Sequence, residues 1–457
     1  MIGRINNLLD RLEIPFVLFW EFMLIIRMVS VYTLLPSTLD SGIFTVIAFV
    51  GACLLLRNGI LWLMRKKKLD LLLVIFTIAM GVSSIASFTG LVANIKIIFW
   101  QMLFFFVVYE LGNREDKRIF VYVEKLLIFL WFVLVSISLG MFLARFSYTM
   151  PLDKLYYGIR LGFFENRLYG VFVDPNYAAT ISVVALLFSI HLNTKTTSNL
   201  FKGFLGLNIA FQFLYVVLSG SRTAQIELFA AAIVLSFFIS YSTMKNINGI
   251  KKIVKPALTA ICVVLATGVL YIGTQKVSVT IINQIDQTTS VQRPEDDEGI
   301  TLNREDVDTN SDSSNGRLKL WASAFEIFKT RKLVGTSPRN YVEYAQEHLP
   351  NTWISLKEQT PHNFFFYLLA TTGLLGTIPF TLFILVKIFQ SLATLFNMKT
   401  SKYFSFVYAV TIALVILISA CLITDIVLVN KLGAMLFFLY LGRVNYRNTE
   451  IKKEELG

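Results

Sequence analysis

Long apolar runs recur along the whole chain and constrain its fold more than any other feature. Several extend for about 18 residues or more, enough for a helix to cross a hydrocarbon core about 30 Å thick. The mean hydropathy is +0.63 and only 16% of the 457 residues are charged, against about 25% in soluble domains. A transmembrane barrel would instead show alternating segments of about ten residues. The sequence therefore predicts an all-α, polytopic integral membrane protein.

We expect about twelve membrane spans, and these divide the chain into three parts. Residues 1–275 are predicted to hold spans one to nine, residues 276–361 a long loop, and residues 362–457 spans ten to twelve with a tail. The predicted spans are 14–35, 42–64, 69–88, 91–111, 119–143, 175–192, 203–218, 223–241, 256–271, 362–386, 403–423 and 426–441.

Basic residues predict the orientation of these spans. One set of short connections is rich in Lys and Arg, as in Arg65-Lys66-Lys67-Lys68, whereas the short connections on the other side hold a single Arg. By the positive-inside rule, both termini are expected in the cytoplasm, and the loops 144–174 and 276–361 outside. The same rule accounts for the net charge of +12 without nucleic acid as a partner. The first apolar run lacks a small-residue cleavage site, so we expect it to remain as an anchor.

The cysteines and the long loop have different roles in this scheme. Cys53, Cys262 and Cys421 all fall inside apolar runs, so neither a disulfide framework nor a metal site is predicted. Within the loop, the acidic stretch 295–312 has the composition of a disordered segment. The stretch 316–331 carries apolar residues at helical spacing and predicts an amphipathic helix on the outer face.

The helical spacing in the loop involves Leu318, Trp321, Phe325 and Phe328. A second short helix is expected to start at Ser337-Pro338, because a capping residue followed by proline is a common helix start.

Three of the expected spans begin with polar motifs on the outer side. The motifs are Asp174-Pro175-Asn176, Ser219-Gly220-Ser221-Arg222-Thr223 and Thr360-Pro361-His362-Asn363. A helix N-terminus presents free N–H groups and the positive end of the helix dipole, which suit a phosphate. If the three converge, they form a pocket for a diphosphate at the outer leaflet.

Each residue also has a purely structural interpretation. Asp174 is most often a cap in such a motif, Arg222 could reach the interface from a lipid-facing helix, and His362 could be a satisfied cap. Trp321 could face the membrane or pack, and Arg167 and Arg317 could be surface charges. The alternative is that the arginines bind phosphate oxygens in pairs of hydrogen bonds.

His362 is the best candidate for a general base, since a neutral imidazole is accessible near neutral pH. It stands where a helix dipole disfavours the imidazolium. His191 is expected near the cytoplasmic end of a span and His348 in the loop, where a solvated role fits better.

The ordered set of motifs resembles the O-antigen ligase and polysaccharide polymerase superfamily of bacterial envelopes. The resemblance covers about residues 165 to 380. It is carried by Arg167-Leu168-Tyr169-Gly170-Val171-Phe172, Asp174-Pro175-Asn176, Ser219-Gly220-Ser221-Arg222-Thr223, Gly316-Arg317, Trp321, Gly335, Pro361-His362-Asn363 and Gly373-Leu374-Leu375-Gly376.

The resemblance implies a GT-C-like, metal-independent glycosyltransferase without a cofactor, which acts on undecaprenyl-diphosphate-linked glycans at the outer face of the cytoplasmic membrane. It assigns catalysis to His362, Arg222 and Arg317. It places Arg167, Asp174, Asn176, Ser221, Trp321 and Asn363 in substrate binding. The glycan, membrane lipid, a flippase and a chain-length regulator are the partners that it suggests.

The leading hypothesis is polymerisation of lipid-linked repeat units into surface polysaccharide. The nearest alternative is a ligase that transfers the glycan to a lipid or protein acceptor. A transporter of polysaccharide or lipid-linked glycan would require ionisable residues within the membrane, and Glu21, Arg27, Lys96, Glu110, Glu124 and Lys431 lie in or near spans. Clustering of the polar motifs at one face favours surface chemistry over alternating access. A sensor would need a cytoplasmic output domain, and the sequence shows none.

Overall fold

The structure is a computed structural model. It describes residues 2–151, 158–244, 247, 249–288, 301–302, 316–397, 404–423 and 427–456. The acidic stretch predicted to be disordered, 295–312, lies outside the described residues apart from 301–302. Helices dominate the described chain and confirm the all-α class, to which a small antiparallel sheet is added.

The first half of the chain forms the following elements: α1 (Ile2–Ile26), a 3-10 turn (Ser30–Leu34), α2 (Ser37–Leu63), α3 (Leu71–Ser87), α4 (Leu91–Leu103), a π-helical turn (Phe104–Val108), α5 (Tyr109–Gly112), α6 (Arg118–Leu143), β1 (Ser147–Met150), β2 (Ile159–Phe164), β3 (Arg167–Gly170), α7 (Pro175–Asn193) and α8 (Asn199–Leu218).

The second half forms α9 (Arg222–Ser242), α10 (Lys251–Thr288), α12 (Arg317–Thr330), α13 (Tyr341–His348), α14 (Trp353–Lys357), α15 (Phe364–Asn397), α16 (Phe404–Leu422) and α17 (Leu432–Leu456). Within the described ranges, nine helices are long and apolar enough to cross a membrane. The other three predicted spans also lie on helices, namely α1, α3 and α17.

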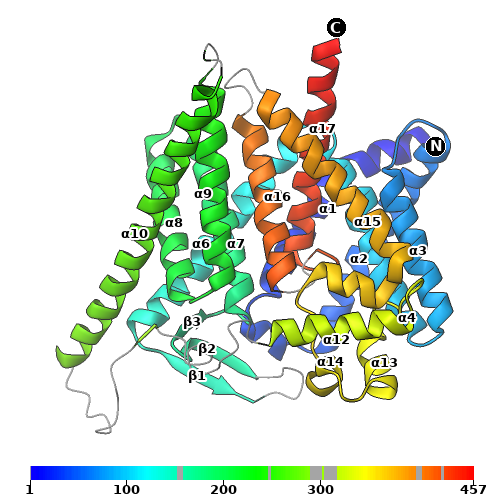
Figure 1. Ribbon diagram of the computed structural model, residues 1–457, viewed down its shortest axis with the longest axis horizontal. Helices are drawn as coiled ribbons and strands as arrows, with labels where there is room; N and C mark the ends of the chain where they lie inside the picture. The colour runs from blue at the N-terminus through cyan, green and yellow to red at the C-terminus, as the bar shows by residue number, and fades with distance from the viewer. Residues whose placement is uncertain are drawn as a thin grey trace.

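The sheet and the helices α12, α13 and α14 lie together at one end of the helix bundle, which we name the loop face (Figure 1). The C-terminal end of α17, the end of α9, the start of α10 and the end of α15 lie at the opposite end, which we name the terminus face (Figure 1). The described sheet of the predicted loop 144–174 and the helices α12 to α14 of the predicted loop 276–361 are therefore on the same side of the bundle, as their expected topology requires.

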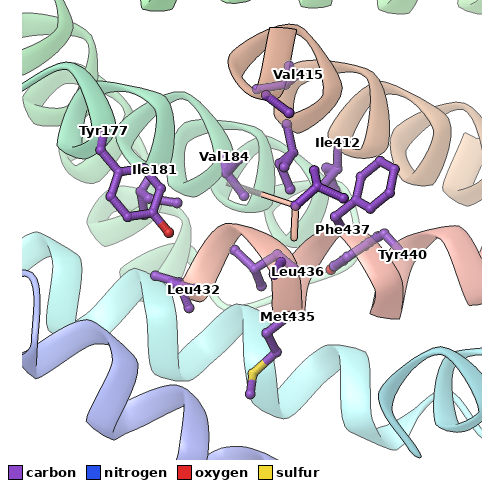
Figure 2. Close-up of a cluster of buried hydrophobic side chains, with 14 of the residues drawn as sticks. Tyr177, Ile181, Val184, Ile412, Val415, Leu432, Met435, Leu436, Phe437 and Tyr440 are labelled. Atoms are coloured by element: carbon purple, nitrogen blue, oxygen red, sulfur yellow. The ribbon is translucent and has the colours of Figure 1, made fainter. Parts of the chain in front are cut away.

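α7 is the central helix of the bundle. In its apolar window 89% of residues are buried, whereas the corresponding value for α10 is 11%. Figure 2 shows Tyr177, Ile181 and Val184 of α7 packed against α16 and α17. Small residues such as Ala178 and Ala179, both fully buried, allow close approach of neighbouring helices within a membrane.

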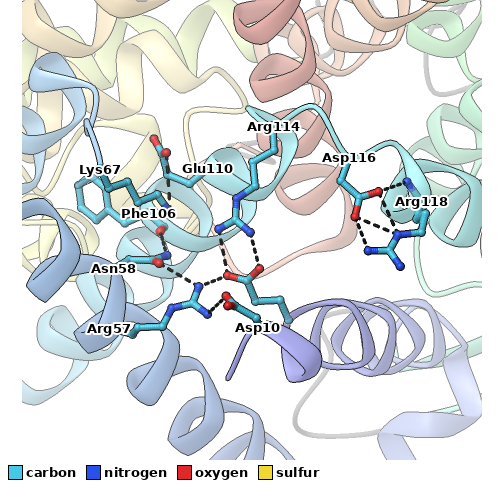
Figure 3. Close-up of polar contacts among 10 residues, drawn as sticks. Asp10, Arg57, Asn58, Lys67, Phe106, Glu110, Arg114, Asp116 and Arg118 are labelled. Atoms are coloured by element: carbon cyan, nitrogen blue, oxygen red, sulfur yellow. Dashed lines mark hydrogen bonds and ion pairs between the residues drawn. The ribbon is translucent and has the colours of Figure 1, made fainter. Parts of the chain in front are cut away.

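At the terminus face, ion pairs around the buried side chains of Arg57 and Glu13 join α1, α2 and the turn after α5 (Figure 3). The Arg57 guanidinium contacts Asp10 at 2.7 Å and also pairs with Glu13, while Arg114 contacts the other oxygen of Glu13 at 2.5 Å. The two arginines share a single glutamate, and each charge has a partner, as burial requires. Burial lowers the pKa of Lys67, in the nearby connection, to about 8.

The loop 144–174 contains a three-stranded antiparallel sheet that the sequence did not suggest. The strand order is β1-β2-β3, with an irregular register between Gly162 and Phe163. Strands of four residues are too short to show an alternating pattern. β3 is buried along its whole length because it packs against α6, α7 and α8.

The first predicted span is wrong at its end, since α1 stops at Ile26 rather than continuing to residue 35. The next residues pair instead with the segment before α7. Ser30 donates its N–H to the Val171 carbonyl at 2.8 Å, and Val173 donates to the Met28 carbonyl at 3.0 Å. Backbone pairing with a distant segment therefore replaces the helical hydrogen bonds here.

α15 is broken at Gly373, which has φ 57° and ψ −157°. The segment from Lys332 to Ser337 fills the break. The N–H groups of Leu374 and Leu375 donate to the carbonyls of Lys332 and Leu333 at 2.8 and 3.0 Å. Irregular backbone inside a membrane protein is tolerated where other protein groups satisfy it. Gly335, also left-handed at φ 67°, faces Thr371 so closely that a Cβ would lie 2.4 Å from its carbonyl carbon.

The break predicts that Gly373→Ala lowers stability. The backbone there is accessible essentially only to glycine, and a Cβ would lie 2.5 Å from the Leu333 oxygen. Strain of this type costs on the order of 1–3 kcal/mol before any clash is added. We expect a lower midpoint of thermal unfolding in detergent. The matched control is Gly59→Ala in α2, where nothing lies within 4 Å of the added carbon. Equal midpoints of thermal unfolding for the two variants would show that the break does not require glycine at position 373.

Candidate functional site

Three helices begin at the loop face with the predicted polar motifs. Asp174 caps α7, because its carboxylate accepts the N–H groups of Asn176 at 2.9 Å and Tyr177 at 3.4 Å. Ser221 caps α9 by accepting the Ala224 N–H at 3.3 Å. Asn363 caps α15 by accepting the N–H of Phe365 at 2.9 Å. Each cap satisfies N–H groups that a helix start otherwise leaves open.

The three helix starts converge on the loop-face end of α16. The Asn363 side-chain amide donates to the Cys421 carbonyl at 2.9 Å. One and a half turns into α7, the Thr180 hydroxyl lies 3.1 Å from the Ser419 hydroxyl. It also donates to Glu227 of α9 at 3.0 Å. Three positive helix-dipole ends are thereby held around one helix.

Arg167 connects the sheet to two of these starts. Its side chain is 6% exposed. Its Nε donates to the Ser219 carbonyl at 2.8 Å and its Nη2 donates to the Asn176 side-chain oxygen at 2.6 Å. The guanidinium therefore links β3, the first turn of α7 and the end of α8. The side-chain oxygen of Asn176 accepts one of the hydrogen bonds that form this link.

The residues before Arg167 form the tight turn of the β2–β3 hairpin. Glu165 and Asn166 have φ of 50° and 56°. Arg160 on β2 donates to Glu165 at 2.8 Å, and the Tyr169 hydroxyl donates to the other Glu165 oxygen at 3.1 Å. Burial raises the pKa of the Tyr169 phenol. The tyrosine therefore stays neutral and remains a hydrogen-bond donor.

Arg222 is the first residue of α9 and is half-buried. Within the described parts of the chain, no hydrogen bond or ion pair engages its guanidinium. A full positive charge therefore coincides with a helix N-terminus, an arrangement suited to an anion.

α12 begins at Arg317, directly after Gly316 in a left-handed conformation with φ 76°. It packs across α15, and the Trp321 ring stacks on Phe366 with centroids 5.3 Å apart. Arg317 and Trp321 are both half-buried. α12 thus covers the start of α15, and we call it the roof.

The face of α12 that packs against the protein is not the predicted apolar stripe. Leu318 and Phe325 are 59% and 43% exposed, whereas the residues that pack are Leu320, Ser323, Ala324 and Ile327. Small residues on the packed face let α12 approach its neighbours, and Ser323 accepts the N–H of Trp353 at 2.8 Å. The predicted second helix also begins later than expected, at Tyr341, because Ser337 is left-handed at φ 73° and pairs with Thr371 instead.

His362 stands outside α15, one residue before the cap. Its φ is 52°, a left-handed conformation that is uncommon for residues other than glycine and worth attention near a site. The ring is half-buried, and its Nδ1 lies 3.4 Å from the Thr360 hydroxyl. The cap of α15 is Asn363 and not His362. Both ends of the Asn363 amide make structural hydrogen bonds.

Glu227 is a buried member of this region that the sequence reasoning missed. It is fully buried, and one carboxylate oxygen has no partner among the described residues. The sequence does show an acidic residue inside an apolar run at this position. Such residues are costly within a membrane and usually mark a functional site, so this pattern could have identified Glu227. Among the described residues, no group of three or more His, Cys, Asp or Glu gathers as a metal site; metal independence remains a prediction.

The described chain therefore has the architecture of a polytopic helical membrane protein. Its loop face carries three capped helix starts, with an arginine at one of them and a left-handed histidine beside another. Residues 207–381 match the family model described as O-antigen ligase. The match confirms the resemblance over this segment and is consistent with a member of the O-antigen ligase and polymerase superfamily. It indicates ligase- or polymerase-type processing of glycans. A comparison with curated proteins finds no match.

Arg222, Arg317, Trp321 and His362 fall inside the matched segment, whereas Arg167, Asp174 and Asn176 precede it. Arg167 nevertheless contacts the matched segment, at the carbonyl of Ser219.

The indole N–H of Trp321 generates a prediction. It is buried, and no acceptor for it lies among the described residues; a buried unpaired donor costs about 1–3 kcal/mol. Trp321→Phe keeps the ring but removes the N–H. We expect an unchanged or slightly higher unfolding midpoint, together with a KM for lipid-linked glycan raised by about tenfold. Trp62→Phe, at an exposed position of α2, is the control. A lower midpoint with an unaltered KM would mean that the indole serves packing alone.

Proposed function

We propose that this protein polymerises undecaprenyl-diphosphate-linked repeat units at the outer face of the cytoplasmic membrane. The observation that carries the proposal is the convergence of three helix N-termini on α16, with Arg222 at one start and His362 beside another. Such a site suits a leaving diphosphate next to a group that can take a proton.

The distribution of basic residues supports the proposed orientation. The network in Figure 3 joins the start of α1 to the end of α2 and to the turn before α6. Near it lie the connections that contain Arg65, Lys66 and Lys68 or Arg114 and Lys117. These basic connections accompany the terminus face, which the positive-inside rule assigns to the cytoplasm. The loop face is then outside, where lipid-linked repeat units would be joined.

In the proposed reaction, a sugar hydroxyl of one repeat unit attacks the anomeric carbon of a second glycan. The bond from that carbon to the diphosphate oxygen breaks, and its electron pair leaves with the lipid diphosphate. His362 accepts the hydroxyl proton, while Arg222, Arg317 and the helix starts stabilise the charge on the leaving group. Because diphosphate is already a good leaving group, the protein mainly positions the substrates and neutralises charge.

A ligase is the second candidate, and the description of the matching family favours it. The two activities share the bond that breaks and differ in the acceptor. Purified protein supplied with lipid-linked repeat units separates them: a ladder of longer glycans supports the polymerase, and transfer only after a lipid or protein acceptor is added supports the ligase. Translocation without new bonds would indicate a transporter.

The proposed orientation predicts the labelling of single cysteines. After Cys53, Cys262 and Cys421 are replaced, a cysteine at the exposed position Glu347 should react with a membrane-impermeant maleimide in intact cells. One at the exposed Lys66, on the terminus face, should react only after the membrane is opened. Labelling of the Lys66 position in sealed cells would overturn the orientation.

The proposed roles predict different losses in two variants. His362→Gln should lower the rate of glycan transfer by about 10²–10⁴-fold while donor binding is retained, because the amide cannot take up a proton. The acidic limb of the pH–rate profile, where the imidazole becomes protonated, should disappear from the residual activity. Arg222→Lys should weaken donor binding, since an ammonium cannot form the paired contacts of a guanidinium.

The controls for these variants are His348→Gln and Arg339→Lys, which change exposed residues of the loop face. Both should transfer glycan at the unmodified rate. If His362→Gln elongates chains as fast as the unmodified protein, His362 is not the base.

A further inference from the structure

A second polar cleft opens on the loop face, mainly between helices that precede the segment matched by the family model. It consists of two adjoining cavities of about 320 and 460 Å³. Arg27 and Asn430 line both cavities. The walls come from the loop-face ends of α1, α2, α4 and α7, and from the residues leading into α17.

Some of the charge in this cleft is already neutralised. The Arg27 guanidinium donates to both carboxylate oxygens of Asp40, at 2.9 and 2.5 Å, and lies 3.3 Å from the centre of the Phe44 ring. Tyr32 donates to the same carboxylate at 2.7 Å. The carboxylate of Asp174 is occupied in capping α7. The lining of the two cavities thus holds three cations, Arg27, Lys96 and Lys431, and two carboxylates, Asp40 and Asp174, which leaves a net charge of +1.

Two lysines contribute the excess positive charge. Lys96 lines one cavity and Lys431 the other, and within the described residues neither forms an ion pair. The Lys431 ammonium lies 5.5 Å from the centre of the Tyr177 ring, which keeps it against the start of α7. Lys96 is exposed and Lys431 is half-buried, so both ammonium groups can contact a ligand that enters from the loop face. The cleft is therefore complementary to an anion.

The surroundings of the cleft suit an anion that carries a lipid chain. Lys96 lies about one and a half turns into α4, beside Val92 and Ile95, which are 70% and 56% exposed. Val31, next to the mouth, is 48% exposed. Lipid-facing apolar residues thus border a cationic cleft, and Trp100 adds an aromatic wall on which a sugar or an isoprenoid can pack.

The cleft and the candidate site share the first turn of α7. Asp174 and Tyr177 line the cleft, whereas Asn176, between them in sequence, is bonded to Arg167 and through it to the turn before Arg222. Residues of the cleft and of the candidate site thus lie next to one another in the first turn of α7.

We propose that this cleft binds the diphosphate headgroup of the acceptor, a second lipid-linked glycan, while the site at Arg222 binds that of the donor. The inference rests on the proposed polymerase function, because a polymerase joins two molecules that each carry a lipid diphosphate. A transfer to an acceptor without a lipid diphosphate would need only one such site.

The test is the number of isoprenyl diphosphates that the protein binds. We would titrate the purified full chain, in nanodiscs of phosphatidylcholine, with radiolabelled undecaprenyl diphosphate. The unmodified protein should bind two per chain. Lys96→Gln combined with Lys431→Gln should retain one tight site and weaken the other by at least about tenfold, as expected when charged hydrogen-bond donors are lost. Arg222→Ala should weaken the opposite site.

The matched control is Lys276→Gln combined with Lys357→Gln, which removes the same charge from exposed positions outside the cleft; it should still bind two. A single site in the unmodified protein, or two unaltered sites in the Lys96 and Lys431 double variant, would overturn the proposal. Displacement from the second site by phosphatidylglycerol at equal concentration would also overturn it, since the cleft would then be a phospholipid site.

A kinetic arm separates this inference from the proposed function. With a lipid-free repeat-unit oligosaccharide as acceptor, the double lysine variant should transfer glycan as fast as the unmodified protein. With a lipid-linked acceptor, its KM should rise by about tenfold. If the double lysine variant and the unmodified protein have equal KM values for the lipid-linked acceptor, the proposed acceptor site is refuted but the polymerase function is not. If the unmodified protein transfers no glycan at all, the proposed polymerase function is itself refuted.

Discussion

The guanidinium of Arg167 joins the pieces of backbone on which the loop face depends. It is nearly fully buried and contacts the first turn of α7 and the turn that leads into α9. A buried charge is tolerated only when its hydrogen bonds are made within the protein. The residues that follow this strand, Val171 to Val173, are in turn paired with the chain after α1. Removal of this side chain would therefore release several elements together.

The break in α15 sets the position of the roof. Because the segment from Lys332 to Ser337 makes four backbone hydrogen bonds across the break, the chain that leaves α12 is tied to the middle of α15. Ser83 of α3 adds a hydrogen bond to the Thr371 carbonyl at 2.7 Å. α12 is thus held over the start of α15, where Trp321 stacks on Phe366. A roof fixed in this way keeps Arg317 on the same side as His362 and Arg222.

Local signals in the sequence were reliable wherever the relevant interaction is also local. An apolar run long enough to cross a membrane must become a helix, since no other segment satisfies its own backbone there. Asp174 before Pro175 and Ser221 before Arg222 act on N–H groups two or three residues away. Gly335 and Gly373 stood out as motif residues, although their purpose became clear only from the contact between their two segments.

Sequence alone determined the class of this protein, the helices and the polar motifs that begin three of them, because these follow from hydropathy and from contacts within a few residues. The tertiary structure decided where α1 ends, that a sheet forms between α6 and α7, which face of α12 is buried, and that Lys96 and Lys431 line one cleft. Those outcomes depend on pairing and packing between segments tens to hundreds of residues apart. No local pattern encodes them. A backbone group can form its hydrogen bond, and an apolar face can be buried, with any of several distant segments, and the tertiary fold decides which segment is adjacent.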